Sequence, residues 1–150
     1  MADKKTILIV EDNSDIRRLM ALSLERAGYE VVEAETGLGA IGRANATHPD
    51  LITMDLGLPD ITGDEVIARL KADPATKQIP VIVITAYFKS APVVESALAA
   101  GACEVLSKPV ALRTLEDTLH RLLITMGTGI SRTEITSDLR LIATTDLRDD

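Results

Sequence analysis

Residues 51–72 read LITMDLGLPDITGDEVIARLKA and contain the repeating unit of the fold. The unit opens with an apolar run of strand length, Leu51 to Met54, which ends at the acidic Asp55. A turn rich in Gly, Pro and Asp follows, and apolar residues then recur at helical spacing from Asp64 to Ala72. The stretch therefore predicts a short buried strand, a loop and an amphipathic helix.

The same unit recurs along the chain, which makes five strand-then-helix units. The other strands are expected at 7–10, 29–34, 81–84 and 102–106, and the other helices at 15–27, 38–46, 92–100 and 112–126. Gly28 is a stop signal for the first helix, and Asn13 or Ser14 can cap its start. Short strands separated by helices imply right-handed crossovers and a parallel sheet covered on both faces.

The composition bounds the size and class of the protein. A chain of 150 residues with 46% hydrophobic content has material for one ordinary globular domain. The pattern changes after Met126, so we predict a domain at 1–126 and a C-terminal tail at 127–150 that is flexible or docks. The formal charge of −7 argues against direct, non-specific binding to nucleic acid. No stretch approaches the roughly 20 apolar residues of a membrane span, so the expected location is cytoplasmic.

Polar side chains follow four of the predicted strands directly. They are Glu11 and Asp12 after the first strand, Asp55 after the third, Thr85 after the fourth and Lys108 after the fifth. Because the carboxyl ends of parallel strands meet at one edge of a sheet, these side chains are expected to share a crevice. Three carboxylates would raise one another's pKa there unless a cation neutralised them, and oxygen ligands favour Mg²⁺. Mg²⁺ leaves positions free for phosphate oxygens, and Asp55 can then act as a nucleophile.

Four motifs in this order resemble the receiver domains of response regulators in two-component signalling. They are Glu11-Asp12-Asn13, Met54-Asp55-Leu56-Gly57-Leu58-Pro59-Asp60 with Gly63, Thr85-Ala86, and Lys108-Pro109, and the resemblance spans about residues 5–126. Each motif alone is common by chance, but their order, spacing and strand-end positions together are specific. The resemblance implies a doubly wound, flavodoxin-like α/β fold with a five-stranded parallel sheet in the order 2-1-3-4-5.

The resemblance also assigns roles to the site residues. It makes Asp55 the phosphoacceptor and places a cis peptide bond before Pro109. The implied ligands of Mg²⁺ are Asp12, Asp55, the backbone carbonyl of Gly57 and, through water, Glu11. The implied contacts of the phosphoryl group are the ammonium of Lys108, the hydroxyl of Thr85, which would swing toward it, and the Ala86 amide.

By the same resemblance, the chain is a stand-alone phosphorylation-dependent signalling switch or phosphorelay carrier rather than an enzyme. A histidine kinase or a histidine phosphotransfer protein would supply the phosphoryl group, and a downstream protein of unknown identity would read it. A second copy of the chain is a further candidate partner.

Two features depart from the family pattern. Many receivers carry Phe or Tyr three residues before the site lysine, where this chain has Val105. Tyr87 and Phe88 follow Thr85 closely and could supply a substitute aromatic ring, or could instead pack or face a partner. Gly57 offers no side chain to position a water molecule and Tyr87 could shield the acyl phosphate, so slow loss of phosphate is expected.

Three alternative functions are weighed against this interpretation. The stretch GLGAIG at 37–42 has the form of a dinucleotide-binding motif of an NAD-dependent oxidoreductase, but Glu33 and Glu35 precede it and would repel a pyrophosphate. A haloacid-dehalogenase-like phosphatase needs a second acid two residues after its nucleophile, where Gly57 stands. A receiver fold that serves as a scaffold without phosphorylation is the third, and the intact site residues argue against it.

Overall fold

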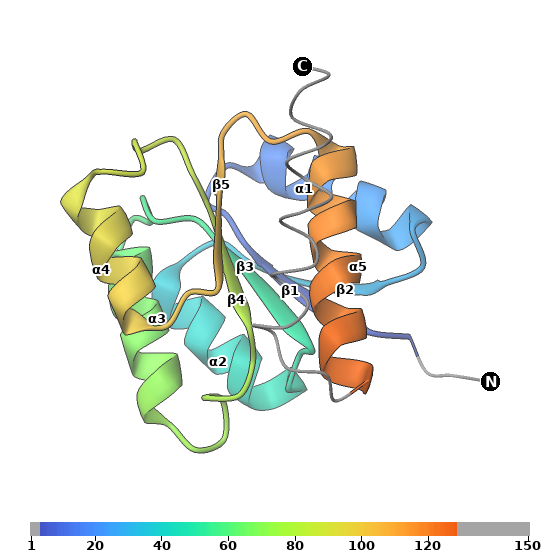
Figure 1. The fold of residues 1–150 in the computed structure, drawn as a ribbon, viewed down its shortest axis with the longest axis horizontal. Coiled ribbons are helices and arrows are strands. Elements are labelled where there is room, and N and C mark those ends of the chain that lie inside the picture. Colours follow the sequence, from blue (N-terminus) through green and yellow to red (C-terminus); the bar gives the residue numbers. More distant parts are fainter. Residues whose placement is uncertain (1–3, 129–150) are drawn as a thin grey trace. The chain divides into compact units, whose positions relative to one another are not determined.

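The structure is a computed structural model, and it describes residues 4–128 (Figure 1). Over this range strands and helices alternate regularly, as the sequence predicts. The strands are β1 (Thr6–Val10), β2 (Glu30–Ala34), β3 (Leu51–Met54), β4 (Val81–Thr85) and β5 (Glu104–Ser107). The helices are α1 (Ser14–Arg26), α2 (Gly37–Thr47), α3 (Gly63–Ala72), α4 (Pro92–Ala100) and α5 (Leu112–Thr128). The predicted elements are all present, and their ends lie within two residues of the predicted ones.

The described strands form one parallel sheet in the order β2-β1-β3-β4-β5, which confirms the predicted topology. In the register of the sheet, Val10 at the end of β1 pairs with Met54 at the end of β3. At the other side of the sheet, Thr85 pairs with Ser107 of β5. The strands therefore end nearly level, and the residues that follow β1, β3 and β5 leave the sheet at one edge.

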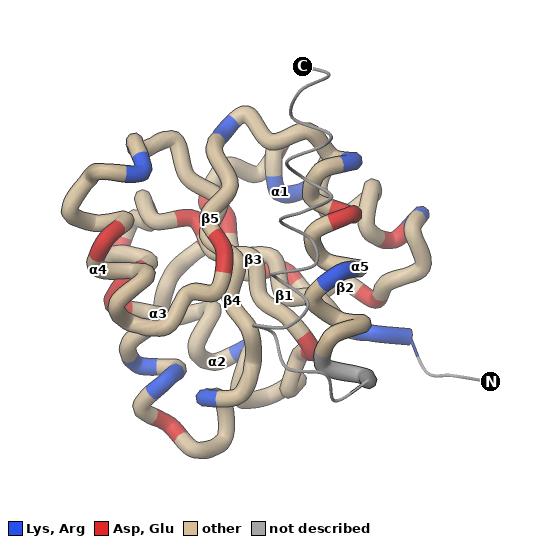
Figure 2. The backbone as a smooth tube through the Cα atoms, viewed as in Figure 1, with Lys and Arg blue, Asp and Glu red and all other residues tan. Residues whose placement is uncertain are grey.

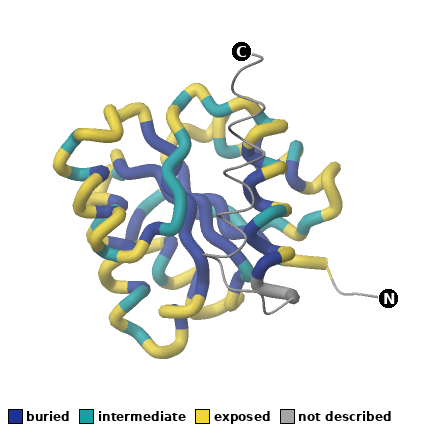
Figure 3. The backbone as a smooth tube through the Cα atoms, viewed as in Figure 1, coloured by how far each residue is buried: buried dark blue, intermediate teal, exposed yellow. Residues whose placement is uncertain are grey.

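Side chains alternate between the two faces of the central strands. Leu8 and Val10 belong to a buried core that also contains residues of α2, α3 and α4. Ile7 and Ile9, which alternate with them, are also fully or almost fully buried. Figure 3 shows the central strands as the buried part of the molecule, and Figure 2 shows charged residues in the helices and loops around them. A sheet buried on both faces explains why its strands read as continuous apolar runs.

Local signals define the ends of the helices. The Asn13 side chain accepts a hydrogen bond from the Ile16 N–H at 2.9 Å, so Asn13 caps α1 and Ser14 is its first residue. Gly28, with φ of 104°, follows the end of α1 as predicted. Helix α4 begins at Pro92 and is followed by Gly101 with φ of 123°. Both glycines adopt backbone angles that other residues rarely tolerate, which stops each helix at that point.

The described residues fall into two compact units, 4–112 and 113–128. Helix α5 continues to Thr128, two residues beyond the predicted end at Met126. The tail predicted at 127–150 lies, from residue 129 onward, outside the described residues, and the domain boundary at 126 stays a prediction. Within the described part of the chain, no helix has the length and apolar character required to cross a membrane.

Candidate functional site

Three carboxylates converge at the edge of the sheet. Glu11 and Asp12 lie in the loop between β1 and α1, and Asp55 directly follows β3. One carboxylate oxygen from each residue lies within 4.8 Å of the others. The pairing of β1 with β3 continues past the strand ends, because the Asp55 N–H donates a hydrogen bond to the Val10 carbonyl at 3.0 Å. Glu11 and Asp55 are buried and Asp12 is exposed, so this group of three carboxylates opens to solvent on one side.

Lys108 reaches this cluster from the end of β5. Its Nζ lies 2.7 Å from Glu11 Oε1 and 3.3 Å from Asp55 Oδ2. The Lys108 N–H donates to the Thr85 carbonyl at 2.8 Å, which joins the ends of β4 and β5. The peptide bond between Lys108 and Pro109 is cis, as the family resemblance implied. The predicted convergence of Glu11, Asp12, Asp55 and Lys108 is therefore present; these four residues are called the acidic cluster below.

The electrostatics of the acidic cluster favour a bound cation. Burial raises the pKa of Glu11, and the charge of Asp55 adds to the rise, despite hydrogen bonds from Lys108 and the Asn13 N–H. Burial alone would lower the pKa of Lys108, but its hydrogen bond to Glu11 and the charges of Asp55 and Glu11 raise it instead. Three carboxylates and one ammonium leave a formal charge of −2. A divalent ion offsets that charge and relieves the repulsion between the carboxylates.

The donor set of the acidic cluster fits Mg²⁺. It offers carboxylate oxygens, the ligands preferred by hard cations, and neither sulfur nor imidazole. Gly57 follows Asp55 by two residues, and its N–H donates to Asp55 Oδ1 at 3.3 Å. A Cβ atom at Gly57 would meet no other atom within 4 Å, so the space beside Asp55 is open at this residue. The three carboxylates thus fit a hard cation, while ligation by the backbone carbonyl of Gly57 stays a prediction.

Gly63 explains how the loop after Asp55 is held. A Cβ atom there would lie 2.4 Å from the Asp55 carbonyl oxygen and 2.8 Å from the Leu56 Cα. The Gly63 N–H donates to the Leu56 carbonyl at 3.0 Å, which closes the loop at the start of α3. Only a residue without a side chain allows this approach, and the backbone of the candidate phosphoacceptor depends on it. The sequence motif included Gly63, but only the structure shows that the close approach of the Asp55 and Leu56 backbone requires a glycine there.

Thr85 lies at the expected strand end and is buried. Its hydroxyl oxygen accepts a hydrogen bond from the Tyr87 N–H at 3.1 Å. The expected contact between Thr85 and a phosphoryl group stays a prediction.

The position where many receivers carry an aromatic ring is filled by Val105, which is partly buried against the core. Phe88, a candidate substitute for that ring, is 85% exposed, which excludes a packing role for it in this conformation.

Asp60 has a role that sequence reasoning missed. Its carboxylate accepts hydrogen bonds from the Gly37 and Leu38 N–H groups, both at 2.8 Å. The bond from Leu38, with that from Gly37, lowers the pKa of Asp60 from its ordinary value of 3.8 to about 2. These N–H groups are the ones that a helix N-terminus offers to a phosphate. Because an acid of the chain already occupies them, the GLGAIG stretch is not free to bind a dinucleotide.

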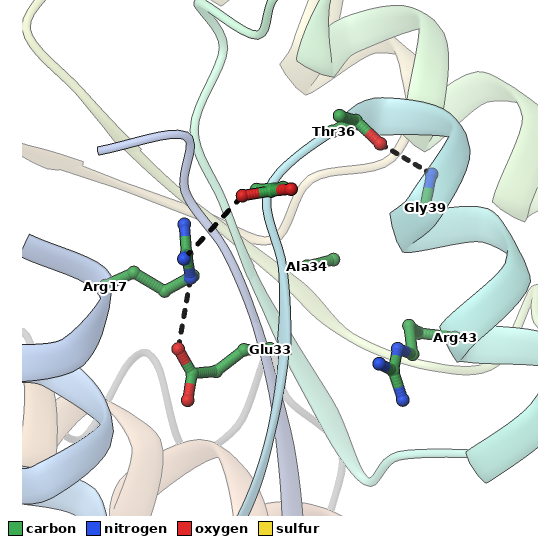
Figure 4. Close-up of a pocket in the computed structure, with 7 residues that line it drawn as sticks. Arg17, Glu33, Ala34, Thr36, Gly39 and Arg43 are labelled. Carbon is green, nitrogen blue, oxygen red and sulfur yellow. Dashed lines mark hydrogen bonds and ion pairs between the residues drawn. The ribbon is translucent and has the colours of Figure 1, made fainter. Parts of the chain in front are cut away.

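The two glutamates before that stretch are paired rather than isolated. Arg17 Nε lies 3.0 Å from Glu33 Oε1, and Arg17 Nη2 lies 3.8 Å from Glu35 Oε2. These residues line a surface hollow of about 340 Å³. Figure 4 shows Arg17 beside Glu33, with Arg43 and the start of α2, where Thr36 caps Gly39, on the other side. Arg17, Glu33 and Glu35 are called the paired cluster below. The sequence offered no signal for this pairing, because the partners come from different elements.

Comparison with known proteins identifies the family that this arrangement fits. A family model described as the response regulator receiver domain matches residues 7–120. The polar-differentiation response regulator DivK of Brucella ovis is 38% identical over 116 residues, which cover 77% of this chain and 93% of DivK. The phosphate regulon transcriptional regulatory protein PhoB of Pseudomonas aeruginosa is 40% identical over 131 residues, 87% of this chain and 57% of PhoB.

Solved structures show the same fold. A CheY-like response regulator receiver domain protein from Methanospirillum hungatei superposes with a TM-score of 0.80 at 28% identity, covering 85% of this chain and 99% of the other. The receiver domain of the sensor histidine kinase PA1611 from Pseudomonas aeruginosa superposes with a TM-score of 0.74 at 29% identity, covering 81% and 98%. That receiver was solved with a magnesium ion coordinated in its active site cleft.

Proposed function

The chain belongs to the response regulator receiver domain family, whose members are phosphorylation-dependent signalling switches, and we propose that Asp55 is the phosphoacceptor of this switch. One observation carries the proposal. A carboxylate oxygen of the buried Asp55 lies within 4.8 Å of oxygens of Glu11 and Asp12, and Asp55 Oδ2 lies 3.3 Å from the Lys108 ammonium. An aspartate carboxylate that attacks a phosphoryl group needs cations on both sides of the incoming oxygens, and this site can supply them.

The proposed metal is Mg²⁺, held by Asp12, Asp55, the backbone carbonyl of Gly57 and, through water, Glu11. The ion would neutralise charge on the phosphoryl oxygens during transfer. Asp12 is exposed, so its carboxylate can bind the ion from the open side of the cluster. The magnesium ion in the active site cleft of the PA1611 receiver supports this assignment by analogy.

Lys108 and Thr85 are proposed to hold the phosphoryl group after transfer. Lys108 Nζ already bridges Glu11 and Asp55, so a phosphoryl group on Asp55 would offer it oxygens in the place where it now contacts carboxylates. The Thr85 hydroxyl would exchange its bond with the Tyr87 N–H for one to the phosphoryl group. Hydrolysis of the acyl phosphate is proposed to be slow, because Gly57 has no side chain to position an attacking water and Tyr87 would shield the group from solvent. A measured lifetime of seconds would contradict this proposal of slow hydrolysis.

Family membership implies input from a histidine kinase and output through a downstream partner. We propose that the immediate donor is that kinase or a histidine phosphotransfer protein, in the cytoplasm, and that the partner binds at α4 and β5. Leu98 of α4 and Phe88 in the loop before it are exposed apolar side chains on that side. Phosphorylation would shift the population of conformations there. The excess of acidic residues makes direct contact with nucleic acid unfavourable, and a second copy of the chain remains a candidate partner.

The test is phosphorylation by a small donor. The purified protein is incubated with acetyl phosphate and Mg²⁺, and its intact mass is recorded beside an Asp55→Asn variant and a sample with excess chelator. We expect one phosphoryl group on the wild type and none in either control. Absence of any addition to the wild type would overturn the proposed function and favour the scaffold alternative.

A further inference from the structure

We propose that Arg17 is a positioning residue for the metal site, because its guanidinium holds the backbone of the loop between β1 and α1. This loop, residues 11–13, contains Glu11 and Asp12 and is called the metal-binding loop below. The inference rests on the proposed function, since it concerns the affinity of the same site for Mg²⁺. Arg17 belongs to the paired cluster and is not among the residues expected to contact the metal or the phosphoryl group.

The Arg17 side chain connects the paired cluster to the backbone of the acidic cluster. Its Nη1–H donates a hydrogen bond to the backbone carbonyl of Glu11 at 2.8 Å, while its Nε–H donates to Glu33 at 3.0 Å. The side chain is only 15% exposed, so the guanidinium is held in place rather than extended into solvent. Figure 4 shows this side chain oriented toward Glu33. The fork of Arg17 thus ties the start of the metal-binding loop to β2.

The bond to Glu11 matters because of which peptide it fixes. The Glu11 carbonyl belongs to the peptide unit that leads into Asp12, the exposed carboxylate expected to bind the ion. On the preceding side, the Glu11 N–H donates to the Ala34 carbonyl at 3.1 Å. With Arg17 on the carbonyl, the backbone is held on both sides of Glu11. Groups that orient metal ligands in this way commonly change metal affinity by about 10-fold to 100-fold when they are removed.

The Arg17 guanidinium could affect Mg²⁺ affinity through its charge or through the backbone that it holds, and the two cases predict opposite effects of its removal. If the guanidinium acted only through its positive charge, removing that charge would make the acidic cluster more attractive to a cation, and Mg²⁺ would bind more tightly. If it acts by holding the Glu11 carbonyl, its removal loosens the loop and Mg²⁺ binds more weakly. Lysine keeps the charge but lacks the planar fork that reaches two partners at once.

The experiment measures Mg²⁺ affinity of the unphosphorylated protein by calorimetric titration. The variants are Arg17→Met and Arg17→Lys, and the matched control is Arg18→Met, because Arg18 is 68% exposed and lies 3.8 Å from the same Glu33. We expect both Arg17 variants to bind Mg²⁺ about tenfold more weakly and the Arg18 variant to stay within about twofold of wild type. In acetyl phosphate reactions, the rate of the Arg17 variants should recover at saturating Mg²⁺.

Several results would overturn the inference. Wild-type affinity in both Arg17 variants, with only a lower melting temperature, would reduce Arg17 to a structural residue. Tighter binding in Arg17→Met, or full rescue in Arg17→Lys, would assign its effect to charge. If Arg17→Met does not fold, Arg17→Lys alone decides between weaker and unchanged binding. A wild type that binds no Mg²⁺ would overturn the proposed metal site as well, which distinguishes the two failures.

Discussion

The acidic cluster and the paired cluster lie at neighbouring strand ends and have similar composition, but they differ in their balance of charge. The acidic cluster contains three carboxylates and one ammonium, and the ammonium contacts only Glu11 and Asp55 among them. In the paired cluster, one guanidinium lies between Glu33 and Glu35, and the nearby helix N-terminus is capped by Asp60. The number of acids at a strand end is therefore a weaker indicator of chemistry than the charge left uncompensated after the fold has formed.

The largest expected effect is on the rate of phosphorylation, when the Lys108 ammonium is removed from the acidic cluster. Lys108→Met should slow phosphorylation by acetyl phosphate about 100-fold at saturating Mg²⁺, because a preorganised cation at the phosphoryl oxygens is lost. The same change takes the formal charge of the cluster from −2 to −3, so Mg²⁺ should bind more tightly. Intact-mass time courses and calorimetric titration measure the two effects.

A matched control for this change is Lys77→Met, because Lys77 is exposed on the loop that follows α3. It should leave both quantities unchanged. An unchanged rate in Lys108→Met would show that the ammonium does not contact the phosphoryl group and would reduce Lys108 to a neutralising partner of Glu11.

The next effect compares one carboxylate from each cluster. Asp12→Asn should weaken Mg²⁺ binding by at least about tenfold, because a charged oxygen ligand is replaced by a neutral one. Glu35→Gln removes the same charge from the paired cluster and should change the affinity by less than about twofold. Equal losses in the two variants would mean that the ion senses only the total negative charge of this edge.

A smaller effect is expected from the last glycine of the GLGAIG stretch. Gly42 lies inside α2, and a Cβ atom there would meet no other atom within 4 Å. Gly42→Ala should therefore raise the free energy of unfolding by about 1 kcal/mol, because alanine is the better helix former. Chemical denaturation measures the gain, and Gly63→Ala is the opposite control, since its Cβ would collide with the Asp55 carbonyl. A loss of stability in Gly42→Ala would show that α2 needs this glycine.

The smallest effect concerns the cap of α2 and depends on pH. The pKa of Asp60 is lowered from 3.8 to about 2 in the folded protein. Its ionised form therefore stabilises the fold above the unfolded-state value, and this contribution is lost as the pH falls through about 2. Asp60→Asn should have a slightly lower melting temperature than wild type at pH 7, and the difference should shrink between about pH 4 and pH 2. A difference that is constant with pH would contradict a role for the charge.

Much of the candidate site could be predicted because its residues lie at the ends of the strands or directly after them. Asp55, Thr85 and Lys108 each stand at the end of an apolar run, so identifying the strands also identified the edge where they meet. The alternation of strand and helix, together with the family motifs, gave the strand order that the structure confirms.

The partners of Asp60 and Arg17 could not be predicted in this way. Asp60 contacts residues 22 and 23 positions away, and Arg17 contacts a glutamate 16 positions away on another element. Nothing in the local pattern of either residue indicates these contacts. They depend on how α1, β2 and the loop after β3 approach one another, which periodicity does not specify.

The sequence by itself determined the elements, the parallel sheet and the edge at which the carboxylates gather, because hydrophobic periodicity and strand-end positions are local properties of the chain. Only the tertiary structure decided which acidic residues at that edge are compensated. Glu33 and Asp60 are satisfied by a guanidinium and by helix N–H groups. Glu11 and Asp55, by contrast, share the one ammonium of Lys108, and Asp12 adds a third carboxylate beside them. Electrostatic compensation requires a partner within a few ångströms, and that distance exists only after the chain has folded.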